Sequence, residues 1–312
     1  MTPFCAAIDW GTSSFRLWLM SEAGTVIAER QSDEGMMRAA AIGFDVVLER
    51  HLAELGVAEE LPVVMCGMVG ARQGWQEAGY LDTPADLAAI IGKARKIIDA
   101  YPRDVRVLPG IAQREAGAPD VMRGEETQLL GLVAQGIGKG LVCMPGTHSK
   151  WVRLKGGKVD GFSTYMTGEL FAMLSRHSIL SAAVDQAAAV SADAPGFLDA
   201  ARTALADPQA VSNLLFQLRA GQLLGFAPPN EGAARLSGLL IGLELAGVAV
   251  RHGTLRDVVL VASGGLCDLY RAVLECQDLT VHVCDASEAV RRGLWRAAST
   301  FWTAEERQEH AR

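Results

Sequence analysis

In Asp9-Trp10-Gly11-Thr12-Ser13-Ser14-Phe15-Arg16, a carboxylate stands just before a small turn rich in hydrogen-bond donors. Apolar runs predict one strand before this turn, Cys5 to Trp10, and another after it, Phe15 to Met20. A glycine lets the backbone approach a phosphate, whose oxygens can accept from N–H groups and hydroxyls, and Asp9 could hold Mg²⁺ through water. An ordinary hairpin turn closed by Asp and Ser hydrogen bonds explains the same residues equally well. The turn is therefore a candidate phosphate site with a structural alternative.

The spacing of apolar residues predicts an α/β chain. A third strand, Thr25 to Gln31, completes an antiparallel meander, and a helix from Gly43 to Gly56 and a strand from Leu61 to Met68 follow. A second helix is expected from Pro84 to Tyr101 and a further strand from Asp104 to Leu108. The expected buried face of that helix consists of Leu87, Ile90, Ile91, Ala94 and Ile97. The Pro/Gly-rich passage from Pro109 to Gly124 is the predicted domain boundary, which gives domains 1–118 and 119–312.

The same order of elements starts again after this passage. A helix, Glu125 to Ile137, is followed by predicted strands at 141–144, 151–155 and 159–166. Gly146-Thr147-x-Ser149 can be laid over Gly11-Thr12-x-Ser14 with the flanking strands in step. Few identities support the repeat, so chance is the alternative. A true duplication predicts two β-β-β-α-β halves that face each other across a central cleft.

The remaining sequence continues the α/β pattern. A third glycine-containing turn, Ser263-Gly264-Gly265, lies between a strand and a helix, where a backbone without side chains can lie against a flat base. A plain strand-to-helix turn is the alternative. The expected helices are 167–180, 208–224, 231–252, 266–277 and 286–299, and the expected strands are 257–262 and 279–285. The charged tail 303–312 is expected to be frayed.

Composition excludes several classes of protein. The net charge of −7 and the absence of any Lys/Arg-rich run argue against a nucleic-acid partner. The longest apolar stretch, Leu236 to Val250, contains Glu244 and is shorter than the ~20 residues that cross a bilayer, so it predicts a buried helix and no membrane span. The sequence shows no signal peptide, and its six cysteines form no CxxC pair. These features predict a cytoplasmic globular protein, and they are compatible with a homodimer.

Three turns together resemble a known superfamily. Asp9-x-Gly-Thr-Ser-Ser-x-Arg16, Pro145-Gly-Thr-His-Ser-Lys150 and Ser263-Gly-Gly265 are similar to the phosphate-1, phosphate-2 and adenosine motifs of the sugar kinase, heat-shock chaperone and actin superfamily. Four longer motifs resemble the 2-dehydro-3-deoxygalactonokinases more narrowly, over nearly the whole chain. They are Cys66-Gly-Met-Val-Gly-Ala-Arg-Gln-Gly-Trp75, Met122-Arg-Gly-Glu-Glu-Thr-Gln-Leu-Leu-Gly131, Thr147-His-Ser-Lys-Trp151 and Met166-Thr-Gly-Glu-Leu170.

The resemblance implies a fold and an activity. The fold is α/β, with two ribonuclease-H-like (actin-like ATPase) lobes, each a mixed sheet of the five-stranded type flanked by helices, and the final helix can pack back on the N-terminal lobe. The activity is phosphorylation of the 6-hydroxyl of 2-dehydro-3-deoxy-D-galactonate by ATP with Mg²⁺, in D-galactonate breakdown. The alternatives are a kinase for a related acid such as 2-dehydro-3-deoxygluconate and a non-catalytic nucleotide-binding regulator. The second turn lacks the Asp of the superfamily pattern, which leaves Asp9 as the Mg²⁺ anchor.

Phosphoryl transfer to an alcohol needs a carboxylate that accepts the proton. Glu125 and Glu126 open a helix past the boundary, and Glu125 is preferred as base because similar sugar kinases carry an acid directly after the glycine. Both could instead simply favour a helix N-terminus. The expected catalytic residues are Glu125, Asp9 and Glu126, and the expected nucleotide contacts are Gly11, Thr12, Ser13, Arg16, Gly146, Thr147, His148, Ser149, Lys150, Gly264 and Gly265.

An anionic sugar acid calls for an arginine, whose planar fork binds a carboxylate through two hydrogen bonds. Arg72 is the first choice, and Arg16 and Arg123 compete with it. Surface salt bridges would explain these arginines without any ligand. The expected substrate contacts are Arg72, Gln73, Trp75, Arg123 and Glu169, the last of which could equally cap its own helix.

Overall fold

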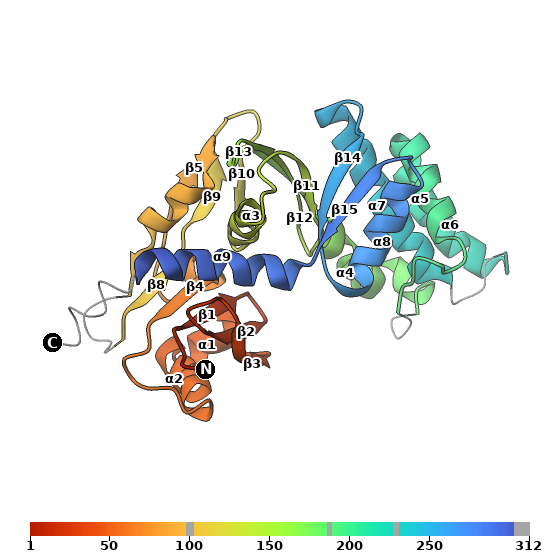
Figure 1. Ribbon diagram of the computed structural model, residues 1–312. Coiled ribbons are helices and arrows are strands. Elements are labelled where there is room, and N and C mark those ends of the chain that lie inside the picture. The colour runs from red at the N-terminus through yellow and green to blue at the C-terminus, as the bar shows by residue number, and fades with distance from the viewer. Residues whose placement is uncertain (98–102, 186–188, 227–230, 303–312) are drawn as a thin grey trace. The chain divides into compact units, whose positions relative to one another are not determined.

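A computed structural model describes residues 1–97, 103–185, 189–226 and 231–302, and Figure 1 shows its ribbon. The chain forms two compact units. The first contains residues 1–139, 154–161 and 286–312, and the second contains residues 140–153 and 162–285. This grouping differs from the boundary predicted near residue 118, because the helix that follows the boundary and the last helix both belong to the first unit.

The first unit contains a six-stranded sheet of order β3-β2-β1-β4-β8-β7. Strands β1 (Cys5–Trp10), β2 (Phe15–Met20) and β3 (Val26–Ser32) are antiparallel, while β4 (Val63–Gly67) and β8 (Val105–Val107) run parallel to β1. Their apolar residues form one core with no exposed surface at Ile8, Trp10, Phe15, Leu17 and Met65. The register places Asp9 between Arg16 on one neighbouring strand and Cys66 on the other.

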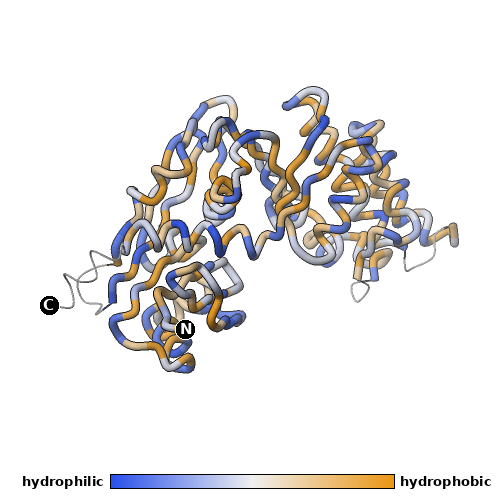
Figure 2. Tube along the Cα trace, in the orientation of Figure 1, coloured by the Kyte–Doolittle hydropathy of each residue, from blue (hydrophilic) through white to orange (hydrophobic). Residues whose placement is uncertain are grey.

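The second sheet repeats this order. From one side it reads β13 (Lys158–Tyr165), β12 (Ser149–Lys155), β11 (Gly140–Met144), β14 (Asp257–Val261) and β15 (Thr280–Cys284). Each sheet also has a sixth, two-residue strand at one edge, β7 (Arg95–Lys96) beside β8 and β6 (Ala85–Asp86) beside β13. With these edge strands set aside, both sheets follow the chain order third, second, first, fourth, fifth, and in both the fourth and fifth strands are parallel to the first. Figure 2 shows apolar residues running along these strands. The shared order confirms the predicted α/β fold of two ribonuclease-H-like halves, while the cleft between them stays a prediction.

Within its described residues, the first unit has four α-helices. They are α1 (Met36–Ile42), α2 (Phe44–Glu54), α3 (Glu125–Ala134) and α9 (Ala286–Phe301). Helix α2 buries Val47, Leu48 and Leu52 in the core of the sheet. Helix α3 packs along α9, which also contacts strands β1 and β4. The last helix therefore lies in the N-terminal unit, as the sequence allowed.

The helix expected from Pro84 to Tyr101 is wrong over its described part. Residues 85–96 form β6 (Ala85–Asp86), a 3₁₀ helix η2 (Leu87–Lys93) and β7 (Arg95–Lys96), while 98–101 lie outside the described residues. The buried Leu87 and Ile90 are three residues apart, which suits a 3₁₀ helix as well as an α-helix. The Asp86 side chain caps η2 by accepting a hydrogen bond from Ala88 N–H. Strand β6 pairs with β13, which is distant in sequence, whereas β7 pairs with β8, the next described strand along the chain.

The passage from Pro109 to Gly124 is also more than a linker. It contains β9 (Gly110–Gln113) and β10 (Asp120–Met122), which join β5 (Tyr80–Asp82) in a three-stranded sheet. The short η1 (Met68–Gly70) follows β4. Strands of three or four residues carry too little periodicity to be recognised from sequence.

The second unit is rich in helices. Its elements are α4 (Thr167–His177), η3 (Ile179–Ala182), α5 (Phe197–Ala206), η4 (Pro208–Ala210), α6 (Val211–Leu223), α7 (Gly232–His252) and α8 (Gly264–Glu275). Helix α7 is long and apolar enough to cross a membrane, and 67% of its most apolar stretch is buried inside the protein. It packs on α4, α5 and α6, which confirms the prediction of a buried core helix.

Candidate functional site

Asp9 is the second-to-last residue of strand β1, and its two carboxylate oxygens have different partners. Its Oδ2 accepts a hydrogen bond from Arg16 Nη2 at 2.7 Å, and the Cys66 thiol is 3.9 Å from Oδ1. Arg16 in turn donates from Nη1 to Ser287 Oγ of α9 at 3.0 Å. Burial raises the pKa of Asp9, and the Arg16 guanidinium opposes that rise. Oδ1 is thus the oxygen left to meet a cation.

The start of helix α1 fixes the backbone of the turn after Asp9 by two hydrogen bonds. The N–H groups of Met36 and Met37 donate to the carbonyls of Gly11 and Thr12 at 2.8 and 3.2 Å. Thr12 and Ser13 are exposed, and their hydroxyls have no hydrogen-bond partner among the described residues. The backbone of the turn is fixed while its side-chain donors face solvent, as an anion site requires.

Glu125 and Glu126 sit very differently at the start of α3. Glu126 has no exposed surface, and its carboxylate accepts from Gly124 N–H at 2.7 Å and from the Thr127 hydroxyl at 3.0 Å. Burial, reinforced by the neighbouring Glu125, raises the pKa of Glu126 to about 8. Glu125 is partly exposed and accepts from Arg123 N–H at 3.1 Å. The geometry therefore favours Glu125 as the carboxylate able to meet a substrate.

Gly124 makes this helix start possible. Its φ of +109° lies in the region that side chains with a Cβ avoid, and it brings the chain sharply into α3. A substituted residue at position 124 would strain the backbone directly before both glutamates.

Cys66 connects Asp9 to the start of α3. It ends β4 beside Asp9, and burial together with the charges of Asp9 and Glu126 raises the pKa of its thiol well above the usual value. Thr127 opposes this rise through a hydrogen bond to the thiol. The thiol is therefore inert as a nucleophile at neutral pH. The first unit brings the predicted metal anchor and the predicted base region onto two sides of one buried side chain.

The predicted sugar-acid residues of the first unit differ in how exposed their side chains are. Arg72 and Gln73 are exposed and, among the described residues, make no ion pair or side-chain hydrogen bond. The Trp75 ring stacks on Phe44 at 6.0 Å and meets Trp10 edge-on, so it belongs to the core.

Arg123 occupies a more enclosed position. It donates from Nη2 to Gly79 O at 2.9 Å, and its guanidinium lies 4.4 Å from the centre of the Tyr80 ring. Its Nε and Nη1 are buried without a partner among the described residues. Gly79 and Tyr80 also line a cavity of about 560 Å³ together with Lys93 and Arg95. This cationic cavity was not anticipated from the sequence.

The second unit joins the turn 146–150 to the start of α4. His148 Nε2 lies 2.5 Å from Glu169 Oε2, and Glu169 N–H donates to Thr147 O at 3.0 Å. A Cβ on Gly168 would lie 2.4 Å from the carbonyl oxygen of Gly146, so only glycine permits this approach. Two motifs that the sequence kept apart therefore form one structure.

Not all of that turn is exposed. Thr147 and His148 face solvent, whereas Ser149 and Lys150 are buried at the start of β12. The Ser149 hydroxyl lies 2.8 Å from the Tyr270 hydroxyl. The exposed donors of the turn are consequently those of residues 146–148.

An apolar pocket of about 170 Å³ lies beside this turn, within the second unit. Helices α4, α7 and α8 contribute its walls, and Leu266 directly follows Gly264 and Gly265. A Cβ built on Gly146, Gly264 or Gly265 would meet no atom within 4 Å, so each faces open space. The walls include Gly146, Phe171, Leu240, Ile241, Leu266 and Leu269. A flat, mostly apolar ring suits such a pocket.

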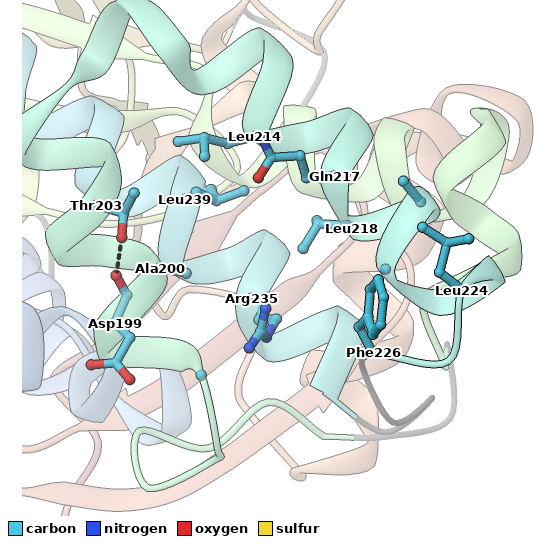
Figure 3. A pocket seen from close by; sticks show the side chains of 13 residues that line it. Asp199, Ala200, Thr203, Leu214, Gln217, Leu218, Leu224, Phe226, Arg235 and Leu239 are labelled. Atoms are coloured by element: carbon cyan, nitrogen blue, oxygen red, sulfur yellow. Dashed lines mark hydrogen bonds between the residues drawn. The ribbon is translucent and has the colours of Figure 1, made fainter.

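A larger cavity of about 510 Å³ lies among α5, α6 and α7 (Figure 3). Its walls are mainly apolar, with Asp199, Gln217 and Arg235 as polar members. None of the predicted site residues lines it. The predicted site residues therefore lie outside this cavity.

Three residues that make contacts at the site have no clear sequence signal. Ser287 holds Arg16 from a helix that starts far along the chain, and Glu34 accepts the Trp10 indole N–H through its carbonyl oxygen. Glu244, whose only sequence signal is a charge in an apolar helix, accepts hydrogen bonds from Trp151, Thr167 and Tyr270.

The duplicated sheets, with an acid and a donor-rich turn after the first strand, define a phosphotransferase of the sugar kinase and actin-like ATPase class. A family model described as 2-keto-3-deoxy-galactonokinase matches residues 9–297. The chain belongs to this family.

Named relatives agree with this membership. A Rhizobium meliloti (strain 1021) protein named "Probable 2-dehydro-3-deoxygalactonokinase DgoK1" is 55% identical over 300 residues, 96% of this chain and 98% of the relative. The 2-dehydro-3-deoxygalactonokinase of Escherichia coli (strain K12) is 34% identical over 295 residues, 94% of this chain and 97% of that one. A crystal structure of a Sinorhizobium meliloti protein assigned to the same activity is 55% identical and superimposes with a TM-score of 0.92, covering 96% of this chain and 100% of the other.

Proposed function

We propose that the protein transfers the γ-phosphoryl group of ATP to the 6-hydroxyl of 2-dehydro-3-deoxy-D-galactonate. The observation that carries this proposal, beside the family, is the placement of Asp9 and the start of α3 around Cys66 within one unit. A metal anchor and a proton acceptor are the two protein groups that phosphoryl transfer to an alcohol needs most.

The residues at Asp9 fit a magnesium ion. The hydrogen bond from Arg16 goes to Oδ2 and not to Oδ1. The positive guanidinium of Arg16 therefore partly compensates the negative charge of the carboxylate on the Oδ2 side. Within the described ranges no group of three acidic, His or Cys side chains converges, so Asp9 would share the ion with phosphate oxygens and water. That is the usual coordination of Mg²⁺ in kinases. The ion supplies neutralisation of the charge that develops on the transferring group.

Each unit offers candidate nucleotide contacts of its own. In the first unit the exposed Thr12 and Ser13 hydroxyls can donate to phosphate oxygens. In the second unit Thr147 and His148 offer further donors, and the apolar pocket beside Gly264 and Gly265 suits the adenine ring.

The proton of the 6-hydroxyl goes to Glu125. As the substrate oxygen forms its bond to the γ-phosphorus, the bond from that phosphorus to the ADP oxygen breaks, and the Glu125 carboxylate accepts the hydroxyl proton. The hydrogen bond from Arg123 N–H fixes the orientation of this carboxylate. Glu169, held by His148, is the proposed contact for the sugar hydroxyls.

A coupled assay of ADP release with Mg-ATP tests the function. We expect strong turnover with 2-dehydro-3-deoxy-D-galactonate and little with 2-dehydro-3-deoxy-D-gluconate, D-galactonate, hexoses or water. A preference for the gluconate epimer would change the substrate that we assign and leave the assigned reaction, phosphoryl transfer from ATP, unchanged. ATP binding without turnover on any acceptor would favour the regulatory alternative.

Arg72 is the proposed carboxylate ligand of the sugar acid. Because its guanidinium is exposed and makes no ion pair among the described residues, Arg72→Ala should raise the KM for the acid at least about tenfold and leave the KM for ATP unchanged. Arg114→Ala, which removes an exposed arginine paired with Asp82, is the matched control. An unchanged acid KM would transfer the role to Arg123 beside the cationic cavity.

The proposed setting follows from the same assignment. We keep a cytoplasmic location, small-molecule partners only, and a homodimer as predictions that go with a catabolic kinase.

A further inference from the structure

Glu244 is a buried carboxylate at the centre of the second unit. It lies in α7 with 2% of its surface exposed. Its Oε1 accepts the Trp151 indole N–H at 2.7 Å, and its Oε2 accepts the Tyr270 hydroxyl at 2.7 Å and the Thr167 hydroxyl. Burial raises the pKa of Glu244, and these donors oppose the rise. A buried carboxyl group held by so many donors fixes the positions of all of them, since each would lose its partner by moving.

The donors come from the segments that surround the proposed nucleotide site. Thr167 is the first residue of α4, directly before the Gly168 that packs on the carbonyl of Gly146. Tyr270 is in α8, the helix that begins at Gly264. Its hydroxyl also contacts Ser149 Oγ at the end of the phosphate turn, at 2.8 Å.

The same side chains form part of the pocket wall. Thr167 and Tyr270 both line the apolar pocket of about 170 Å³ that we assign to adenine. One face of these residues therefore meets the pocket, while their hydroxyls point to Glu244 or Ser149. Glu244 itself does not line the pocket.

We propose that Glu244 is a positioning residue for the nucleotide, holding the phosphate turn, the start of α4 and the adenosine helix in one fixed arrangement through Thr167 and Tyr270. The inference rests on the proposed function, because it assumes that ATP binds at these segments. A preformed site avoids the entropic cost of ordering its walls when the ligand arrives. Loosening the network should therefore weaken nucleotide binding, while Arg72, the proposed ligand of the acid's carboxylate, belongs to the first unit and keeps its surroundings.

Tyr270→Phe is the decisive variant, because it keeps the ring in the pocket wall and removes only the hydroxyl. We expect calorimetry with Mg²⁺ and a non-hydrolysable ATP analogue to give a Kd about tenfold higher than in the unmodified protein. The KM for ATP should rise by the same factor, and the KM for the sugar acid should stay within about twofold. Tyr165→Phe is the matched control: its ring lies against Gly247 of α7, Tyr165 is not among the residues that line the pocket, and its nucleotide Kd should not change.

Thr167→Val supplies a second, nearly isosteric variant. It should weaken analogue binding in the same direction, and the double variant should weaken it by less than the product of the two factors, because both hydroxyls act through Glu244. Melting temperatures of all variants, measured without ligand, record the structural cost of each change.

The outcomes separate the two proposals. If both variants bind the analogue as the unmodified protein does and only melt at lower temperature, the Glu244 network is purely structural and the inference is wrong. If the unmodified protein fails to bind the analogue at all, the proposed function falls, and this inference with it. Weaker nucleotide binding with an unchanged acid KM supports both.

Discussion

Asp9→Asn should lower kcat about a thousandfold while nucleotide affinity changes only a few-fold. The amide retains the shape of the side chain and an oxygen that can accept from Arg16 Nη2. It removes the negative charge from the oxygen that faces the proposed Mg²⁺, and charge stabilisation in the transition state is usually the largest catalytic contribution. Steady-state kinetics across a Mg²⁺ titration, combined with calorimetry of the ATP analogue, measures both effects.

The control for this variant is Asp82→Asn. Asp82 is an exposed aspartate of the same unit that pairs with Arg114, so it loses a charge far from the turn. Its kcat should equal that of the unmodified protein. A near-normal kcat in Asp9→Asn, or a loss fully recovered by raising ATP alone, would contradict the role of Asp9 as metal anchor.

Glu125→Gln should also lower kcat by about a thousandfold and leave the KM values for both substrates nearly unchanged. Glutamine keeps an oxygen that accepts Arg123 N–H, so the side chain stays in place, but an amide cannot take up the hydroxyl proton. Rapid-mix measurement of a single turnover identifies the chemical step as the one that slows. If instead only product release slowed, the assignment of Glu125 as base would be wrong.

Glu126→Gln is the neighbouring control, and its expected effect is on stability. Between pH 4.5 and about 8, folded Glu126 keeps a proton that the unfolded chain releases, so the unmodified protein loses stability as the pH rises through this range. Glutamine does not titrate. The variant should therefore melt several degrees above the unmodified protein at pH 8, with the difference vanishing towards pH 4.5, and its kcat should stay within a few-fold. A kcat loss as large as that of Glu125→Gln would move the base to Glu126.

The duplicated halves could be predicted because their signals are local. A donor-rich turn between two apolar runs specifies a hairpin from residues near in sequence, as at 9–16 and at 146–150. Longer elements such as α7 and α9 carry enough periodicity to be located within a few residues. The prediction for residues 84–96 failed because the buried apolar residues fit two kinds of helix and because β6 and β7 are strands of only two residues, the first of which pairs with the distant β13.

For the candidate site as well, some features could be predicted from the sequence and others only from the structure. Sequence alone predicted roles for Asp9, the two glutamates and the glycine-containing turns, because their chemistry depends on residue type and order along the chain. It preferred Glu125 over Glu126 only through the resemblance to similar sugar kinases, because the burial of two adjacent residues at a helix start depends on packing and cannot be read from residue types. The roles of Cys66, Ser287 and Glu244 likewise depended on contacts between segments far apart in sequence. Residue types and local spacing determined the fold class and the chemistry available to this protein. Which carboxylate is buried, which oxygen is free and which hydroxyls converge was decided by tertiary structure, because burial and hydrogen-bond partners exist only once distant segments pack together.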